Sequence, residues 1–205
     1  MTGPDPTSHR RRPGPPDGEP SVFAADEQSA QLVAVGDLVR LAEAVLADED
    51  VRGECELALY FVDETAMAEL NERFMGVAGA TDVLAFPIDE DLVDPGRTPD
   101  AGATGPDRAP ADPGEVPVLL GDVLICPAVA ARNAEARARA VAAGTGPDPG
   151  DTPNGATELA DELALLVVHG TLHVLGMDHA DAASTATMQA RERELLDRHH
   201  RRVAT

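Results

Sequence analysis

Six consecutive residues, Leu163 to Val168, are apolar and lie in the middle of a segment with a helical pattern. A helix that is apolar on every side has to be covered on every side, so we expect this one in the centre of the molecule. Its start is marked by Glu158, Asp161 and Glu162, since acidic residues suit the positive end of a helix dipole. The rest of the chain therefore has to pack around this helix.

Shorter segments supply the elements that cover it. Apolar patterns bounded by turn residues predict four strands, over residues 21–26, 56–62, 82–86 and 118–126. Helical periodicity predicts further helices over residues 32–46, 63–74, 128–143 and 181–198. Strands mixed with helices in this order favour an α/β fold of the α+β type, in which helices cover a small mixed sheet.

Three segments differ in composition from the rest of the 205 residues, of which 43% are hydrophobic. Residues 1–20 are rich in Pro, Gly and Arg, and residues 89–115 and 144–155 are rich in Pro and Gly with few large apolar side chains. Such segments do not bury enough apolar surface to fold. We therefore predict a disordered tail over 1–20 and one domain over 21–205, with flexible insertions near 89–115 and 144–155.

The charge of the chain restricts its binding partners. The net charge is −21, because 37 acidic residues oppose 16 basic ones, all of them arginines. This balance argues against broad, non-specific binding of nucleic acid. Neither a signal peptide nor the roughly 20 apolar residues of a membrane span is visible, so we expect a cytoplasmic protein without a membrane partner. Cys55 and Cys126 are expected to be free thiols.

The chemistry lies in three histidines that follow the apolar run, His169, His173 and His179. The first two are four residues apart on a helix, so both imidazoles project from one face. Gly176 can adopt a left-handed conformation that ends the helix and brings His179 back to the same point. Three neutral imidazoles and one water form the open tetrahedral site of catalytic zinc. We predict one zinc ion per chain at the end of the buried helix, with nickel as an alternative.

The spacing of the histidines is also that of metzincin peptidases. Those enzymes carry a Glu directly after the first histidine, where it acts as the general base. Here that position holds Gly170. A zinc peptidase without its base would lose much of its rate, so Gly170 disfavours proteolysis, which remains an alternative.

Residues 169–179 resemble the signature of the YbeY family, bacterial endoribonucleases of ribosomal RNA maturation, whose motif reads HGxLHLxGYDH. Val174 and Met177 depart from this motif, and both are apolar. Two further blocks occur in the order of the family: residues 81–87 are similar to TDVLSFP, and residues 120–126 are similar to LGDIxIC. The resemblance covers most of the predicted domain outside the insertions.

This resemblance implies a single-strand-specific, zinc-dependent endoribonuclease that acts on the 3′ end of small-subunit ribosomal RNA and in ribosome quality control. It implies ribosomal RNA and the ribosome or its proteins as partners, and we expect no DNA. The rival function is a non-catalytic ribosome assembly factor in which zinc only holds the fold. One departure favours this rival: where the family often has an arginine thought to assist catalysis, in a YRG triplet, this chain has Met75.

Other polar residues have structural interpretations. Asp178, beside the third histidine, is a weak catalytic candidate that either orients an imidazole or caps the last helix. Asp82 and Asp122 are expected to make hydrogen bonds at strand ends, and His199 and His200 are expected to be exposed. Three arginines of the 128–143 helix either contact RNA phosphates or form a solvated face; they are Arg132, Arg137 and Arg139.

Overall fold

The computed structural model describes residues 19–88, 118–145, 158–177 and 181–200. Four strands form one sheet in the order β1-β2-β4-β3. Strands β1, β2 and β4 are parallel, and β3 pairs with β4 in the antiparallel sense. The strand bounds are Ser21–Asp26 (β1), Cys55–Phe61 (β2), Val83–Pro87 (β3) and Val118–Ile125 (β4). The predicted small mixed sheet is confirmed, with each strand within one residue of its expected ends.

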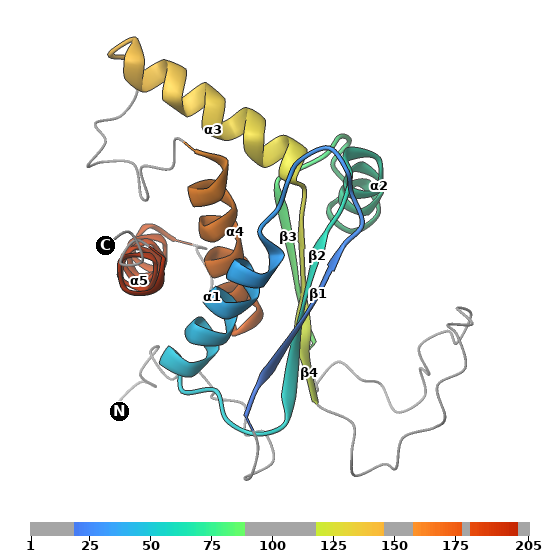
Figure 1. The fold of residues 1–205 in the computed structure, drawn as a ribbon, viewed down its shortest axis with the longest axis vertical. Coiled ribbons are helices and arrows are strands. Elements are labelled where there is room, and N and C mark those ends of the chain that lie inside the picture. The colour runs from blue at the N-terminus through green and yellow to red at the C-terminus, as the bar shows by residue number, and fades with distance from the viewer. Residues whose placement is uncertain (1–18, 89–117, 146–157, 178–180, 201–205) are drawn as a thin grey trace, which may run out of the picture.

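The described residues also form five helices around this sheet. Figure 1 shows α1 and α4 against one face of the sheet, α5 on the outer side of α4, and α2 on the opposite face. Helix α4 contacts α1, α3, α5, β3 and β4, which is the central position expected for it. The helix bounds are Val35–Asp48 (α1), Glu64–Met75 (α2), Pro127–Ala142 (α3), Leu159–Val174 (α4) and Ala182–His199 (α5).

Local sequence signals set the starts of two helices. Helix α2 begins after Asp63, whose side chain accepts a hydrogen bond from the backbone N–H of Ala66 at 2.8 Å. Helix α5 begins with a capping box, in which Asp181 accepts from the N–H of Ser184 at 2.8 Å. In return, the Ser184 hydroxyl accepts from the N–H of Asp181 at 3.0 Å. These caps satisfy N–H groups that have no partner within the helix.

The core has two parts, one on each face of the sheet. The larger part packs the sheet against α1, α4 and α5, and the smaller part packs it against α2. Residues 163–168 of α4 are buried except for Leu165, which is partly exposed. Cys55 and Cys126 are both buried and free, as expected, and burial raises the pKa of both thiols, which keeps them unreactive.

Several expectations fall on residues outside the described ranges. Most of the predicted tail, 1–20, and most of the predicted insertions, 89–115 and 144–155, lie there, as do Asp178 and His179. Among the residues that the structure describes, no helix is long and apolar enough to cross a membrane.

Candidate metal centre

His169 and His173 lie side by side in the second half of α4. Their ring centroids are 4.6 Å apart and the ring planes meet at 79°. Both side chains are half-buried, so each has a buried part and a part that reaches the surface. The structure thus brings together two of the three predicted ligands on one helix face.

The chain reverses directly after these histidines. Gly176 has a φ of 90°, so the prediction that this glycine adopts a positive φ is confirmed. Its N–H bonds to the carbonyl of His173 at 2.9 Å, and the N–H of Met177 bonds to the carbonyl of Leu172 at 3.0 Å. This pair of bonds is a Schellman motif, which ends a helix and turns the chain away from its axis. The turn precedes the third predicted ligand, His179, by three residues.

Gly170 is required by packing. A Cβ atom at this position would lie 2.4 Å from Cγ1 of Val123, a fully buried residue of β4. Real Cβ atoms do not approach other carbons so closely, so α4 lies against the sheet only because residue 170 has no side chain. A glutamate after the first histidine, as in the metzincins, is therefore incompatible with this arrangement.

Glu192 of α5 contacts His169, a contact that was not predicted from the sequence. Its Oε1 lies 2.7 Å from Nδ1 of His169, and its side chain is only 5% exposed. A signal was present in the sequence. Glu192 falls at helical spacing between Met188 and Leu195, in the stripe of α5 that was expected to face inward. An acid in an apolar stripe is costly unless it has a partner.

Two cavities border the histidine pair. One, of about 650 Å³, lies between α3, α4 and α5 and reaches His169. The other, of about 470 Å³, is lined by β3, the end of α4 and Met75, and reaches both His169 and His173. Met75 thus lines the same cavity as both histidines. The guanidinium of Arg73 instead lies over the ring of Phe74, 5.2 Å from its centroid.

The three arginines of α3 all form ion pairs within the molecule. Arg132 donates to both carboxylate oxygens of Glu64, at 2.6 and 2.7 Å. Arg139 pairs with a glutamate one turn earlier on its own helix. Arg137 pairs with Glu162, whose side chain is 3% exposed. Burial raises the pKa of Glu162, and the positive charge of Arg137 opposes that shift.

Two expectations about other polar residues are wrong. His199 and His200 are half-buried and paired, because Asp48 of α1 and Asp161 of α4 lie within 2.9 and 2.7 Å of their Nε2 atoms. Asp122 lies inside β4 instead of at a strand end, and burial raises its pKa.

Asp82 behaves as expected at the start of β3. It accepts hydrogen bonds from the N–H of Val83 at 2.9 Å and from the side chain of Asn133 at 3.0 Å. These bonds join β3 to α3. Asp82 also lines the larger cavity beside His169, so the same contacts fix one wall of that cavity.

The described residues contain only part of the predicted ligand set. Within residues 19–88, 118–145, 158–177 and 181–200, no three His, Cys, Asp or Glu side chains form a group that could hold a metal ion. The predicted triad includes His179, which lies outside these ranges. The assignment of all three ligands therefore stays a prediction at this point.

Known proteins place the chain in a family. The family model described as Endoribonuclease YbeY matches residues 24–146 and 151–200. This chain belongs to the endoribonuclease YbeY family. The resemblance of residues 169–179 to the signature of that family is thereby confirmed. The predicted class, an endoribonuclease and hence a hydrolase, is that of the family.

Individual relatives agree with the family match. The endoribonuclease YbeY of Mycolicibacterium vanbaalenii is 38% identical over 86% of this chain and 79% of its own length. Those of Rhodococcus opacus and Mycobacterium tuberculosis are each 36% identical, covering 83% and 86% of this chain and 77% and 82% of their own. A solution structure from Thermotoga maritima is 19% identical, with a TM-score of 0.45, over 86% of this chain and 89% of that one.

Proposed function

We propose that this chain is a single-strand-specific, zinc-dependent endoribonuclease of ribosomal RNA maturation, with His169, His173 and His179 as the ligands of one zinc ion. The observation that carries the proposal is the pair of adjacent imidazoles at the cavities of a YbeY-family chain. Imidazole nitrogens are donors that suit zinc, and nickel is the alternative ion.

The contacts of His169 fit this donor set. A carboxylate can only accept a hydrogen bond, so Glu192 requires a proton on Nδ1 of His169. In the neutral ring the lone pair is then on Nε2, which faces away from the carboxylate. When bound, zinc supplies a Lewis acid that withdraws charge from a phosphoryl oxygen and makes water acidic enough to attack near neutral pH.

The cavities beside the histidines bear on the kind of substrate that can reach them. The two cavities that reach His169 leave room for RNA on either side of the histidine pair. Unpaired bases of single-stranded RNA can be splayed out into cavities of this kind, which supports a single-stranded substrate. Neither Gly170 nor Met75 carries a group that transfers protons, so we expect a slow enzyme that works best on substrate presented by a partner.

The partner proposed here is the ribosome, in the cytoplasm. With a net charge of −21, the chain gains little from attraction to RNA phosphates. Docking on the ribosome or a ribosomal protein would replace that attraction by raising the local concentration of substrate. We place the action at the 3′ end of small-subunit RNA and in ribosome quality control, carried out by one domain over residues 21–205 with insertions near 89–115 and 144–155.

A second function has a specific observation in its favour. Met75 lies at the histidines where the family often has an arginine, and a methionine does not stabilise negative charge. This favours a ribosome assembly factor in which zinc only holds the fold. Proteolysis has less support, because the packing of Gly170 against Val123 leaves no space for the glutamate that a zinc peptidase uses.

Metal analysis tests the proposed site. Gently purified full-length protein should carry about one zinc per chain, because three histidines leave one open position on a single ion. His173→Ala should lose most of this zinc, while Arg132→Ala, which alters only an exposed ion pair, should keep it. Wild-type protein that carries no zinc and takes up none on titration would refute the site.

A further inference from the structure

The inward face of α5 contains one acid among apolar residues. Met188, Leu195 and Leu196 are buried against the core, and Glu192 is buried among them. Removing a carboxylate from water is costly unless it gains a strong partner. Its position therefore needs an explanation that packing alone does not give.

The partner of this acid is a proposed metal ligand. Oε1 of Glu192 lies 2.7 Å from Nδ1 of His169, within the range of a charge-assisted hydrogen bond. The bond fixes the ring in the tautomer that protonates Nδ1, and it also fixes the rotation of the ring. Histidine ligands of metals commonly donate their second N–H to a carboxylate in this way, which orients the ring and makes the ligand more basic.

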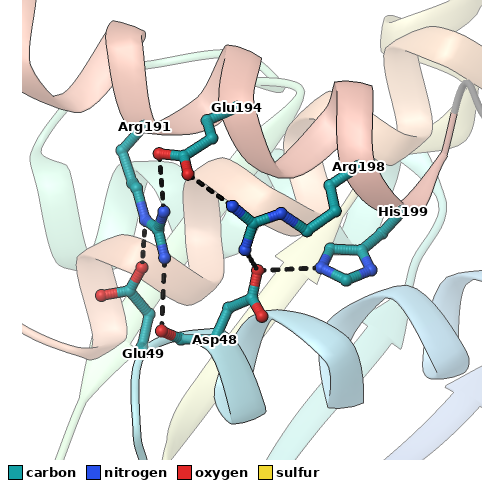
Figure 2. A network of polar contacts seen from close by, with 6 residues as sticks. All are labelled: Asp48, Glu49, Arg191, Glu194, Arg198 and His199. Atoms are coloured by element: carbon teal, nitrogen blue, oxygen red, sulfur yellow. Dashed lines mark hydrogen bonds and ion pairs between the residues drawn. The ribbon is translucent and has the colours of Figure 1, made fainter.

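Helix α5 is held in place from a second side. Figure 2 shows a network that joins Arg191, Arg198 and His199 of α5 to Asp48 and Glu49 at the end of α1. Nε of Arg191 donates to Glu49 at 2.6 Å, and both Arg198 and His199 reach the same oxygen of Asp48. This network fixes α5 against α1, and the buried residues of α5 fix it against α4. We therefore expect the Glu192 carboxylate, which α5 carries, to have little freedom to move.

We propose that Glu192 is a positioning residue of the metal centre, which orients His169 and raises the affinity of the chain for zinc. The proposal rests on the zinc site proposed above. It assigns to α5 a function in metal binding, although α5 supplies no ligand. The contribution acts through the imidazole, so it should change zinc affinity without changing the number of zinc ions bound.

The chain contains a matched control in Glu162. Glu162 lines the same cavity, and its side chain is 3% exposed against 5% for Glu192. Its partner is Arg137, and within the described part of the chain it makes no hydrogen bond or ion pair with a histidine. Substitution of either glutamate therefore disturbs a buried carboxylate and its hydrogen-bonded partner beside the same cavity, but only one substitution disturbs a proposed ligand.

The experiment is a zinc titration of the full-length chain against a chromogenic chelator. Glu192→Gln should lower the affinity for zinc about 10-fold, and Glu192→Ala should lower it up to about 100-fold. Glu162→Gln should keep the wild-type affinity. Nitrogen-15 NMR of zinc-free protein, assigned with His169→Ala, should show His169 protonated on Nδ1 in the wild type and a mixture of tautomers in Glu192→Gln.

Each outcome bears on a separate proposal. Wild-type affinity in folded Glu192→Gln, with zinc lost in His173→Ala, would overturn the positioning role and leave the zinc site intact. Equal losses in Glu162→Gln and Glu192→Gln would also overturn it, since general loosening would then explain both. Wild-type protein that binds no zinc would overturn the site and the positioning role together. If Glu192→Ala does not fold, Glu192→Gln, which preserves the size of the side chain, decides the question.

Discussion

Glu162 on α4 and Glu192 on α5 are both buried beside the cavity between α3, α4 and α5, but their partners differ. Glu162 pairs with Arg137, a group that stays charged at every physiological pH. Glu192 pairs with His169, a group whose ring carries a second nitrogen of the kind that binds metals. A buried acid therefore does not by itself mark a functional site. The chemistry of the partner decides whether the pair serves stability or metal binding.

The Glu162 pair is incompletely satisfied. Oε2 of Glu162 and Nε of Arg137 are both buried, and neither has a hydrogen-bond partner among the residues that the structure describes. Such a pair adds little net stability, because desolvation offsets much of the attraction. Removal of only one partner nevertheless lowers the stability of the fold, because the other charge is then buried without a partner.

Arg137→Ala should have the largest effect on stability. An unpaired buried charge costs roughly 3–5 kcal/mol, and because Arg137 is 31% exposed we expect a loss of about 2 kcal/mol in the free energy of unfolding. Zinc affinity should not change. The loss should shrink as the pH falls through the raised pKa of Glu162, because the protonated carboxyl needs no partner charge. Denaturant unfolding at several pH values measures both effects.

Arg132→Ala is the control for this substitution, since it removes an arginine of the same helix whose carboxylate partner is 47% exposed. It should change the stability little. If Arg137→Ala is as stable as Arg132→Ala, the pair of Arg137 with Glu162 does not contribute to stability in the way proposed.

Gly176→Ala should have a smaller effect on stability but a specific one on the metal. A Cβ at this position meets no atom of the described residues within 4 Å, so we expect strain from the backbone conformation, at a cost of roughly 1–2 kcal/mol. Gly144, at the end of α3, has the same kind of conformation, with a φ of 65° and equally open surroundings. Gly144→Ala should therefore lose similar stability. Zinc titration should show weaker binding only in Gly176→Ala, and equal affinities would mean that His179 does not depend on this turn.

Asp48→Asn should have the smallest effect. Burial raises the pKa of Asp48, but the hydrogen bonds and charges of His199 and Arg198 outweigh burial and lower it. A lowered pKa means that the carboxylate stabilises the fold at neutral pH and loses this contribution as the pH falls through the lowered value. The pairs are partly exposed, so we expect less than about 1 kcal/mol. Acid unfolding should be less steep in the variant; an identical acid profile would contradict the assigned pairing.

The elements of the fold were predictable because their signals are local. Apolar patterns bounded by turn residues placed the ends of the strands within one residue. Asp63 marked the start of α2. Helix α1 was expected from residue 32 but begins at Val35. Leu32, which seemed to extend its apolar stripe, is 97% exposed. The helical spacing of a single apolar residue therefore does not show whether its side chain is buried.

The contacts between elements were not predictable in the same way. His199 and His200 were expected to be exposed, but acids from α1 and α4 lie beside them. The bond between Glu192 and His169 likewise depends on how α5 docks on α4, which no local pattern specifies. Of the candidate site, the spacing of His169 and His173 was readable because both are on one helix. The carboxylate that contacts His169 comes from a different helix, α5.

Cleavage of single-stranded RNA by wild type and by His169→Ala, prepared identically, decides whether the histidines form an active site. Both proteins should be assayed on ribosomal RNA and on ribosomal particles, with and without a chelator, and on a peptide library. We expect slow, metal-dependent cleavage of RNA by the wild type, faster on particles, no cleavage of peptides, and no RNA cleavage by His169→Ala. Equal residual cleavage in the two preparations would indicate a contaminating ribonuclease and contradict the enzymatic function in favour of the assembly factor.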